Sequence, residues 1–318
     1  PRHRWLAAVA SAAAVALFAT AVVAVSAGLH GTPPAGTAAP PRYYVETSFQ
    51  GLQLYVRATA AGRVTAVVPD PRPARGRFLA IAAAGHGVFF TECARLGGAA
   101  GTQARIYRFR VTADGRVTGL APVPGGNLGR LVAGSMAATR HGSRLALGIE
   151  PSGVRRGDHP AEIIVLDPRT GARATWRGGL APRGQDQRTL RIGQRSWTAD
   201  GQQLAYLAAW TCRQPPASAR ASCPDVGPLG YCEEVRSLAP AGRGGRLSSG
   251  RLLLRVPAGD IERVVISPDG ALLTAATVSD LIAWSGHPSR EVTVAQVSAQ
   301  TGQAVRVLYR VRTGPWTA

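Results

Sequence analysis

Short runs of apolar and β-branched residues alternate with glycine-containing polar turns along most of the chain. One recurring unit is an apolar strand, a tight turn ending in glycine, and a second apolar strand, as in Ser196–Leu207 (SWTADGQQLAYL) and Val265–Ala276 (VISPDGALLTAA). The same unit recurs in Leu79–Phe90 and Ser135–Leu147, where histidine replaces the aspartate of the turn. Glycine adopts a positive φ without a Cβ penalty, so such turns are typical of β-hairpins. The predicted turn residues are Gly87, Gly142, Asp200, Gly201, Asp269 and Gly270.

A second unit, a strand, a polar turn and a β-branched strand, alternates with the first. Its copies are Leu54–Val68, Ile106–Leu120, Ile163–Trp176, Val235–Val256 (with a longer turn) and Val292–Tyr309. Together the two units give four short strands in about 50–55 residues, which is the size of a propeller blade. Long helical periodicity is absent after residue 41, which argues against α/β folds. We therefore predict an all-β fold, a β-propeller of about five four-stranded blades over residues 42–312; a β-sandwich is the competing fold.

The segments Ser267–Leu273 (SPDGALL) and Trp197–Tyr206 (WTADGQQLAY) resemble the turn and strand of TolB-type, WD40-like propeller repeats. The order of features along the chain resembles that of membrane-anchored propeller proteins of actinobacteria. This resemblance implies a six-bladed ring, so the chain is expected to be a truncated ring that lacks its final blade, although five blades could also close. An open edge would favour pairing or aggregation. The resemblance implies the fold and carries almost nothing about function.

The N-terminal region carries 25 consecutive uncharged residues, Trp5–Leu29, enough to span a bilayer as a helix. Because Arg2 and Arg4 precede this stretch, the positive-inside rule predicts a cytoplasmic stub over 1–4, a single transmembrane helix over 5–30, and an extracytoplasmic remainder. Cleavage as a signal peptide after Val25-Ser26-Ala27 is the alternative, and it would secrete the same domain.

The chain starts at Pro1, so its natural start is expected to lie further upstream. Residues 31–41 (GTPPAGTAAPP) form a Pro/Gly/Ala-rich linker between helix and propeller. Residues 313–318 form a tail that is too short for another blade.

The formal net charge of +19 comes from 37 basic residues, all arginine, against 18 acidic ones. The arginines are dispersed, without dense runs or interleaved aromatic residues, so codon bias explains them better than a nucleic-acid surface. No nucleic-acid partner is expected. For a domain outside the cell, the accessible partners are a protein, a peptide or an anionic cell-wall polymer, and the membrane is contacted by the chain's own helix.

Three of the four cysteines, Cys212, Cys223 and Cys232, fall in one insertion of the repeat, residues 211–234. In an exported domain a disulfide in this loop is expected, and closing such a loop stabilises by about 3 kcal/mol. Cys212–Cys232 and Cys212–Cys223 both remain open. Their spacing does not match a zinc site, so no metal is predicted. Cys93 is expected to be a buried small apolar residue.

Motifs for catalysis are absent from the sequence: it has no Gly-x-Ser-x-Gly elbow, no phosphate-binding loop with lysine, and no His-Glu-x-x-His helix. No cofactor and no small-molecule ligand can be named from it. The Gly242–Gly245 segment is predicted to lie in a hairpin turn. Four glutamates on predicted strands are candidate acids, without a spacing that selects a pair: Glu46, Glu92, Glu150 and Glu162.

Three functions remain. The favoured hypothesis is a membrane-anchored, extracytoplasmic, non-catalytic binding or scaffold module, with residues 211–234 as a contact loop. The alternative is a transmembrane sensor or regulator whose cytoplasmic part precedes Pro1. The third is a propeller enzyme, which would need acids or ligands that converge in the central channel.

Overall fold

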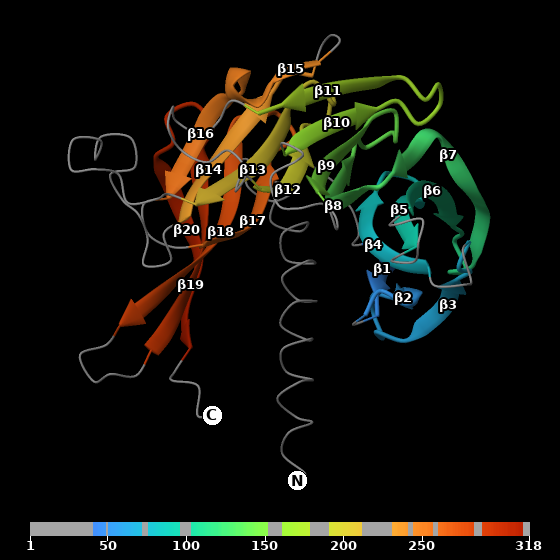
Figure 1. Cartoon of the computed structure of the whole chain (residues 1–318). Coiled ribbons are helices and arrows are strands. Elements are labelled where there is room, and N and C mark those ends of the chain that lie inside the picture. The colour runs from blue at the N-terminus through green and yellow to red at the C-terminus, as the bar shows by residue number, and fades with distance from the viewer. Residues whose placement is uncertain are drawn as a thin grey trace.

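The computed structural model describes residues 41–48, 50–71, 76–95, 103–151, 161–178, 191–211, 231–240, 244–256, 260–282 and 288–313. These residues form five successive β-sheets, the blades of a β-propeller (Figure 1). The predicted all-β propeller with about five blades is confirmed. Within the described ranges no helix has the length and apolar character needed to cross a membrane. The predicted transmembrane segment, residues 5–30, lies outside those ranges.

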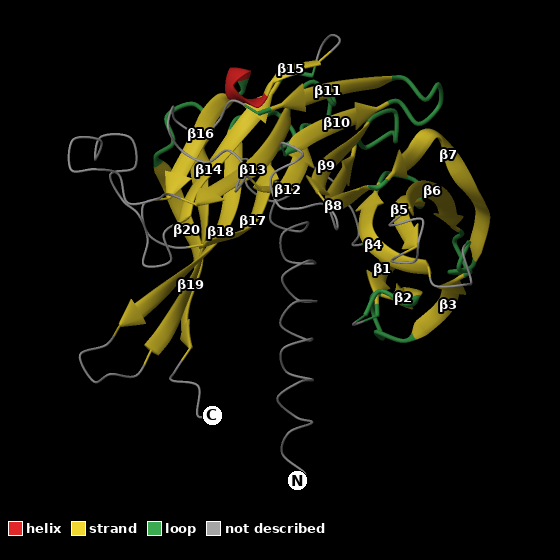
Figure 2. Cartoon of the chain, viewed as in Figure 1, coloured by secondary structure: helices red, strands yellow, loops and turns green. Residues whose placement is uncertain are grey.

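The strands follow one another through the blades in chain order (Figure 2). Blade 1 contains β1 (Tyr43–Thr47), β2 (Leu54–Ala58) and β3 (Val64–Val68), and blade 2 contains β4 (Gly76–Ala83), β5 (Val88–Arg95), β6 (Gln103–Val111) and β7 (Val117–Gly129). Blade 3 contains β8 (Leu131–Ala138), β9 (Leu145–Pro151), β10 (Glu162–Leu166) and β11 (Arg173–Arg177), and blade 4 contains β12 (Arg191–Trp197), β13 (Leu204–Thr211), β14 (Tyr231–Leu238) and β16 (Arg251–Val256). Blade 5 contains β17 (Asp260–Ile266), β18 (Leu272–Ile282), β19 (Pro288–Ser298) and β20 (Ala304–Thr313).

The connection between β14 and β16 departs from a simple hairpin. It contains β15 (Gly244–Arg246) and the 3-10 turn η3 (Leu247–Ser249), and β15 pairs in parallel with β11 of blade 3. The prediction that Gly242–Gly245 lies in a hairpin turn is therefore wrong for Gly244 and Gly245. These glycines let two backbones approach, since a Cβ on Gly244 would lie 2.2 Å from the carbonyl oxygen of Thr175. A segment that connects two strands of blade 4 thus adds a strand to the sheet of blade 3.

The first strands of blades 2 to 5 (β4, β8, β12 and β17) lie next to one another in that order. Each carries a β-bulge at an equivalent place, where the register with its hairpin partner shifts: Phe78/Ala80, Ala133/Ser135, Ile192/Arg195 and Ile261/Arg263. A bulge leaves one or two residues out of the ladder and redirects the neighbouring side chains. The repeat thus extends beyond the turns seen in the sequence to the backbone of the inner strands.

Blade 1 differs from the predicted four strands, because three are described. Its β2–β3 hairpin is the Leu54–Val68 copy of the repeat, equivalent to β6–β7 of blade 2. By that correspondence β1 is equivalent to β5, a second strand. Among the described strands, β2 is the only one that pairs with β1, so the position of an innermost strand in this blade is not filled by any described residue.

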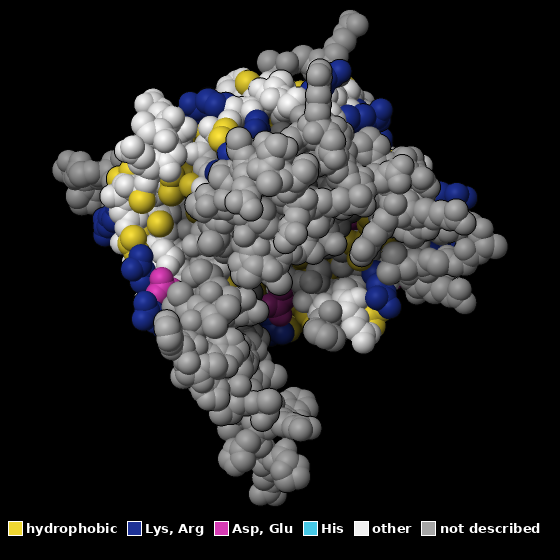
Figure 3. All heavy atoms as spheres, turned by 60° about the vertical axis from the view of Figure 1, so that its left-hand side comes forward, with side chains coloured by type: hydrophobic (Ala, Val, Ile, Leu, Met, Phe, Trp, Pro, Cys, Tyr) yellow, Lys and Arg dark blue, Asp and Glu magenta, His cyan; other side chains and the backbone are white. Residues whose placement is uncertain are grey.

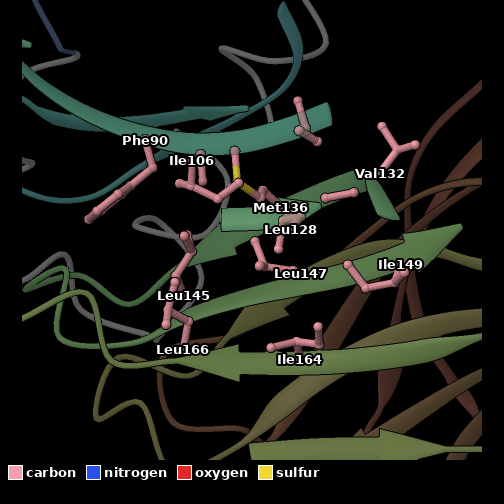
Figure 4. Packing of buried hydrophobic residues seen from close by; sticks show 14 of the residues in the cluster. Phe90, Ile106, Leu128, Val132, Met136, Leu145, Leu147, Ile149, Ile164 and Leu166 are labelled. Atoms are coloured by element: carbon pink, nitrogen blue, oxygen red, sulfur yellow. The ribbon is translucent and has the colours of Figure 1, made fainter. Parts of the chain in front are cut away.

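Apolar side chains hold consecutive blades together through four clusters, one at each junction. The cluster between blades 2 and 3 includes Phe90 and Ile106 from one side and Leu147 and Ile149 from the other (Figure 4). Burying each such side chain contributes about 1.5–3 kcal/mol. The sheets of blades 2, 3 and 4 therefore have two packed faces, and relative movement of neighbouring blades would expose these residues.

Candidate functional site

The predicted turn residues lie where one blade meets the next. In three of these turns, the glycine packs against a residue in the corresponding turn of the preceding blade. That residue stands three positions before the glycine of its own turn. A Cβ added to the glycine would lie 3.5 Å from Ala84 Cβ at Gly142, 2.9 Å from Thr139 Cγ2 at Gly201, and 3.2 Å from Thr198 Cγ2 at Gly270. All three glycines have a positive φ. The turns therefore serve both hairpin closure and contact between blades.

The turn aspartates bond within their own hairpins. Asp200 Oδ1 accepts hydrogen bonds from Thr198 Oγ1 (2.5 Å) and from the backbone N–H of Gln202 (2.9 Å). These donors hold the pKa of Asp200 below its usual value. Asp269 Oδ1 accepts a bond from Ser267 Oγ in the same way. In the two turns where histidine replaces the aspartate, Gly87 and Gly142 keep the positive φ. His86 adopts a positive φ as well (φ 59°).

The candidate acids lie on blades 1, 2 and 3, and those whose side chains are described have different partners. Glu46 forms an ion pair with Arg57, and Glu162 forms one with Arg177 at 2.6 Å. Glu92 is buried, and its Oε1 and Oε2 accept hydrogen bonds from the backbone N–H of Ala133 in blade 3 at 3.0 and 3.1 Å. Burial raises the pKa of Glu92 to about 8, and this hydrogen bond opposes the rise. The side chain of Glu150 lies outside the described part of the structure.

A buried arginine joins blades 3 and 4 near the inner bulges. Arg195 Nη1 donates to the carbonyl oxygen and the hydroxyl of Ser135, both at 2.5 Å, and its Nη2 donates to the carbonyl of Ile192 at 2.7 Å. Ser135 Oγ in turn donates to the carbonyl of Gly193. These bonds bridge the innermost strands of the two blades, so the guanidinium has a structural role.

The cysteines expected to form a disulfide are only partly covered. Cys212 and Cys223 lie outside the described residues, and Cys232 lies on β14 opposite Trp210 of β13. The disulfide therefore stays a prediction. Cys93 is buried, as expected, with its Sγ 3.6 Å from Asp70 Oδ1. In the part of the chain that is described, no group of three or more His, Cys, Asp and Glu side chains could hold a metal ion.

A hollow lies between blades 2 and 3, at the periphery. It has a volume of about 440 Å³ and opens between the β6–β7 hairpin and the turn that joins β10 to β11. We call it the arginine cleft, because the exposed side chains of Arg108 and Arg110 line it. The remaining lining residues are Phe109, Thr118, Gly119, Ala121, Pro122, Val123, Pro124 and Pro168.

The wall of the arginine cleft is fixed by a close backbone contact. Between Pro122 and Asn127, β7 leaves its register with β6 and bulges towards blade 3. At this bulge a Cβ on Gly125 would lie 2.4 Å from the carbonyl oxygen of Gly171, in the β10–β11 turn. Arg173 of β11 donates through Nη2 to the carbonyl of Asn127 at 2.7 Å, and to that of Gly125. These contacts position Pro124 and Pro168 on the two sides of the hollow.

Arg108 and Arg110 point to the same side of β6, because residues two apart on a strand share a face and lie about 6.6 Å apart. Neither guanidinium forms a hydrogen bond or an ion pair with any residue in the described part of the chain. The nearby carboxylate of Asp167 is engaged in its own turn, where it accepts bonds from the N–H groups of Arg169 and Thr170. The cleft thus presents two planar donors in the same hollow as the exposed prolines Pro122 and Pro124.

Comparisons with known proteins found similar structures but no matching family. No protein-family model matches the sequence, and no curated protein sequence matches it. Among solved structures, the chain is similar to the β-propeller domain of Swd1 from Myceliophteria thermophila (15% identity, 84% of this chain, 69% of that one, TM-score 0.42). It is also similar to an oligogalacturonate lyase in complex with manganese (13%, 83% and 61%, TM-score 0.46) and to dipeptidyl peptidase 4 from Porphyromonas gingivalis (11%, 86% and 38%, TM-score 0.40). The chain spans less than two thirds of the lyase and of the peptidase. The five sheets of its described residues make it a β-propeller with five blades.

Proposed function

We propose that this protein is a non-catalytic binding module, a rigid propeller held at the outer face of the membrane by its N-terminal segment, and that it captures an anionic partner. The observation that carries the proposal is that, among the described residues, acidic side chains form ion pairs with arginine, whereas many arginines are exposed without such a pair. The described acids that form ion pairs with arginine are Glu46, Asp114, Glu162, Glu234 and Glu291. Among the described arginines, several outside these pairs are exposed, such as Arg77, Arg251 and Arg306.

Exposed arginines occur on every blade. Figure 3 shows arginine side chains at several places around the described part of one face, with few acidic side chains between them. A surface of one predominant charge sign raises the local concentration of oppositely charged partners and speeds their association. The buried polar groups described above, Glu92 and Arg195, bond to neighbouring blades, which fits a rigid frame that presents its surface.

The proposal is tested with the full chain in nanodiscs. Binding to anionic polymers such as poly-glutamate is measured at low and at raised salt, with the polymer length followed over time. Expected are saturable binding that weakens as salt screens the charges and a polymer of unchanged length. Shortening of the polymer, or absence of binding at low salt, would contradict a non-catalytic anion-binding module. Accessibility of the propeller to protease added to intact cells tests its placement outside the membrane.

A further inference from the structure

The geometry points to the arginine cleft as a binding site for an extended acidic peptide whose carboxylates alternate with apolar side chains. This inference rests on the proposed function. The spacing of the two arginines suits an extended ligand. Arg108 and Arg110 are two residues apart on β6, whose register with β5 is regular here and pairs them with Phe90 and Val88, although the register with β7 shifts between them. Their side chains thus repeat every 6.6 Å or so, the distance between alternate residues of another extended chain.

The donor geometry of the two arginines suits carboxylates. A guanidinium presents N–H groups in a planar fork that matches both oxygens of a carboxylate, and such charge-assisted bonds are among the strongest in proteins. Neither guanidinium has a partner among the described residues, so a ligand carboxylate would not have to displace any of their side chains. Two adjacent forks would select ligands with two carboxylates at the matching distance.

Prolines line the same hollow as the two arginines. Pro122 and Pro124 are exposed there and offer apolar surface without an N–H donor, whereas Val123 and Pro168 line the hollow but are themselves buried. A peptide with apolar side chains on alternate positions could bury them here while its carboxylates reach the arginines. A polymer of sugar or glycerol phosphates has acidic groups at a comparable repeat but no apolar side chains to place on this wall, so the amphipathic peptide is the better match.

The size of the hollow agrees with such a ligand. Ligand sites commonly have volumes of about 300–1,000 Å³, and about 440 Å³ is available here. The prolines of β7 also limit the alternatives, because a strand edge interrupted by proline is poorly suited to main-chain pairing with a peptide. Recognition would therefore rest on side chains.

The test measures fluorescence anisotropy of a labelled peptide of alternating aspartate and valine with the full chain in nanodiscs. The variant Arg108→Gln/Arg110→Gln removes both forks. Its matched control, Arg77→Gln/Arg251→Gln, removes the same charge from exposed positions on β4 and β16. The expected result is a Kd raised about 10- to 100-fold by the cleft variant, from the loss of two charge-assisted contacts, and changed less than about twofold by the control. Thermal unfolding of both variants checks that each remains folded.

Three results separate the possible failures. Equal losses in cleft and control variants would mean that net charge alone drives binding and would overturn the site. Tighter, cleft-dependent binding of poly(glycerol phosphate), or of a peptide with its aspartates and valines in separate blocks, would overturn the ligand class. No binding of any anionic probe by the unmodified chain would overturn the proposed function itself.

Discussion

The guanidinium of Arg195 on β12 occupies the space where Gly148 of β9 has no side chain. A Cβ added to Gly148 would lie 1.2 Å from Nη2 of Arg195 and 2.1 Å from its Cζ. The arginine is buried, so it has little room to move aside. The two residues belong to neighbouring blades and lie 47 positions apart in the sequence. Blades 3 and 4 therefore fit only with a glycine opposite this arginine.

Gly148→Ala is expected to destabilise the protein by about 1–3 kcal/mol, because the methyl group must displace a hydrogen-bonded buried side chain. Chemical denaturation measures this change. In an Arg195→Ala background the same substitution should cost clearly less, which a double-mutant cycle reports as a coupling energy. Additive effects of the two substitutions would contradict the contact.

Glu92 makes the junction of blades 2 and 3 sensitive to pH. Its folded-state pKa, about 8, lies above the ordinary value of 4.5, so the folded protein holds a proton that the unfolded chain releases. The stabilisation from this proton is complete below about pH 4.5 and is lost as pH rises towards 8. The slope is at most about 1.4 kcal/mol per pH unit.

Glu92→Gln keeps an oxygen that can accept the hydrogen bond from Ala133 and cannot ionise. The free energy of unfolding of the variant should therefore not fall between pH 5 and 8. Its stability relative to the unmodified protein should rise as the pH rises. Denaturation curves at several pH values measure the difference. An unchanged pH profile would show that Glu92 is ionised in the folded state. Glu162→Gln, which alters a buried, ion-paired acid on β10 of blade 3, serves as the comparison.

The turn glycines allow backbone strain to be separated from contact between blades. Gly201 and Gly62 have nearly the same φ (68° and 63°), but a Cβ would meet Thr139 Cγ2 at 2.9 Å at Gly201 and nothing within 4 Å at Gly62. Alanine at either position should cost about 1 kcal/mol for the left-handed backbone. Gly201→Ala should cost more than this, and Thr139→Ser, which removes the methyl group, should recover the excess. Equal costs at both glycines would contradict a role in holding blades together.

The turns were predictable because their chemistry is local. The sequence Thr-Ala-Asp-Gly at 198–201 contains the hydroxyl, the carboxylate and the glycine that close the hairpin. Turns with histidine in place of aspartate could be placed by their period alone. The strand β15 could not be predicted, because Gly244 and Gly245 pair with Thr175 and Trp176, about 70 residues earlier, and only the arrangement of the blades brings them together.

The arginine cleft was missed for a similar reason. Arg108 and Arg110 are two of 37 dispersed arginines, and nothing local distinguishes them from the others. Their setting depends on Pro168, which the third blade brings from about 60 positions away. One signal was present: the run Pro122–Gly126 (PVPGG) interrupts a strand with prolines and glycines, and such an interruption indicates a bulge.

The contact between Gly125 and Gly171 offers a way to change the shape of the arginine cleft without touching its charges. Gly125→Ala would place a Cβ 2.4 Å from the carbonyl oxygen of Gly171 and push the β7 bulge away from the β10–β11 turn. The affinity for the alternating acidic peptide should fall about 3- to 10-fold, as expected for the loss of roughly 0.7–1.4 kcal/mol of contact with the wall. Gly129→Ala is the matched control on the same strand, because it shares the positive φ (62°) and meets no atom within 4 Å. Both variants carry the backbone strain, but only the first alters the wall, so the ratio of their Kd values isolates its contribution. Equal affinities would show that the two guanidiniums bind the peptide without the apolar surface, and the preference for alternating over block peptides should then disappear as well.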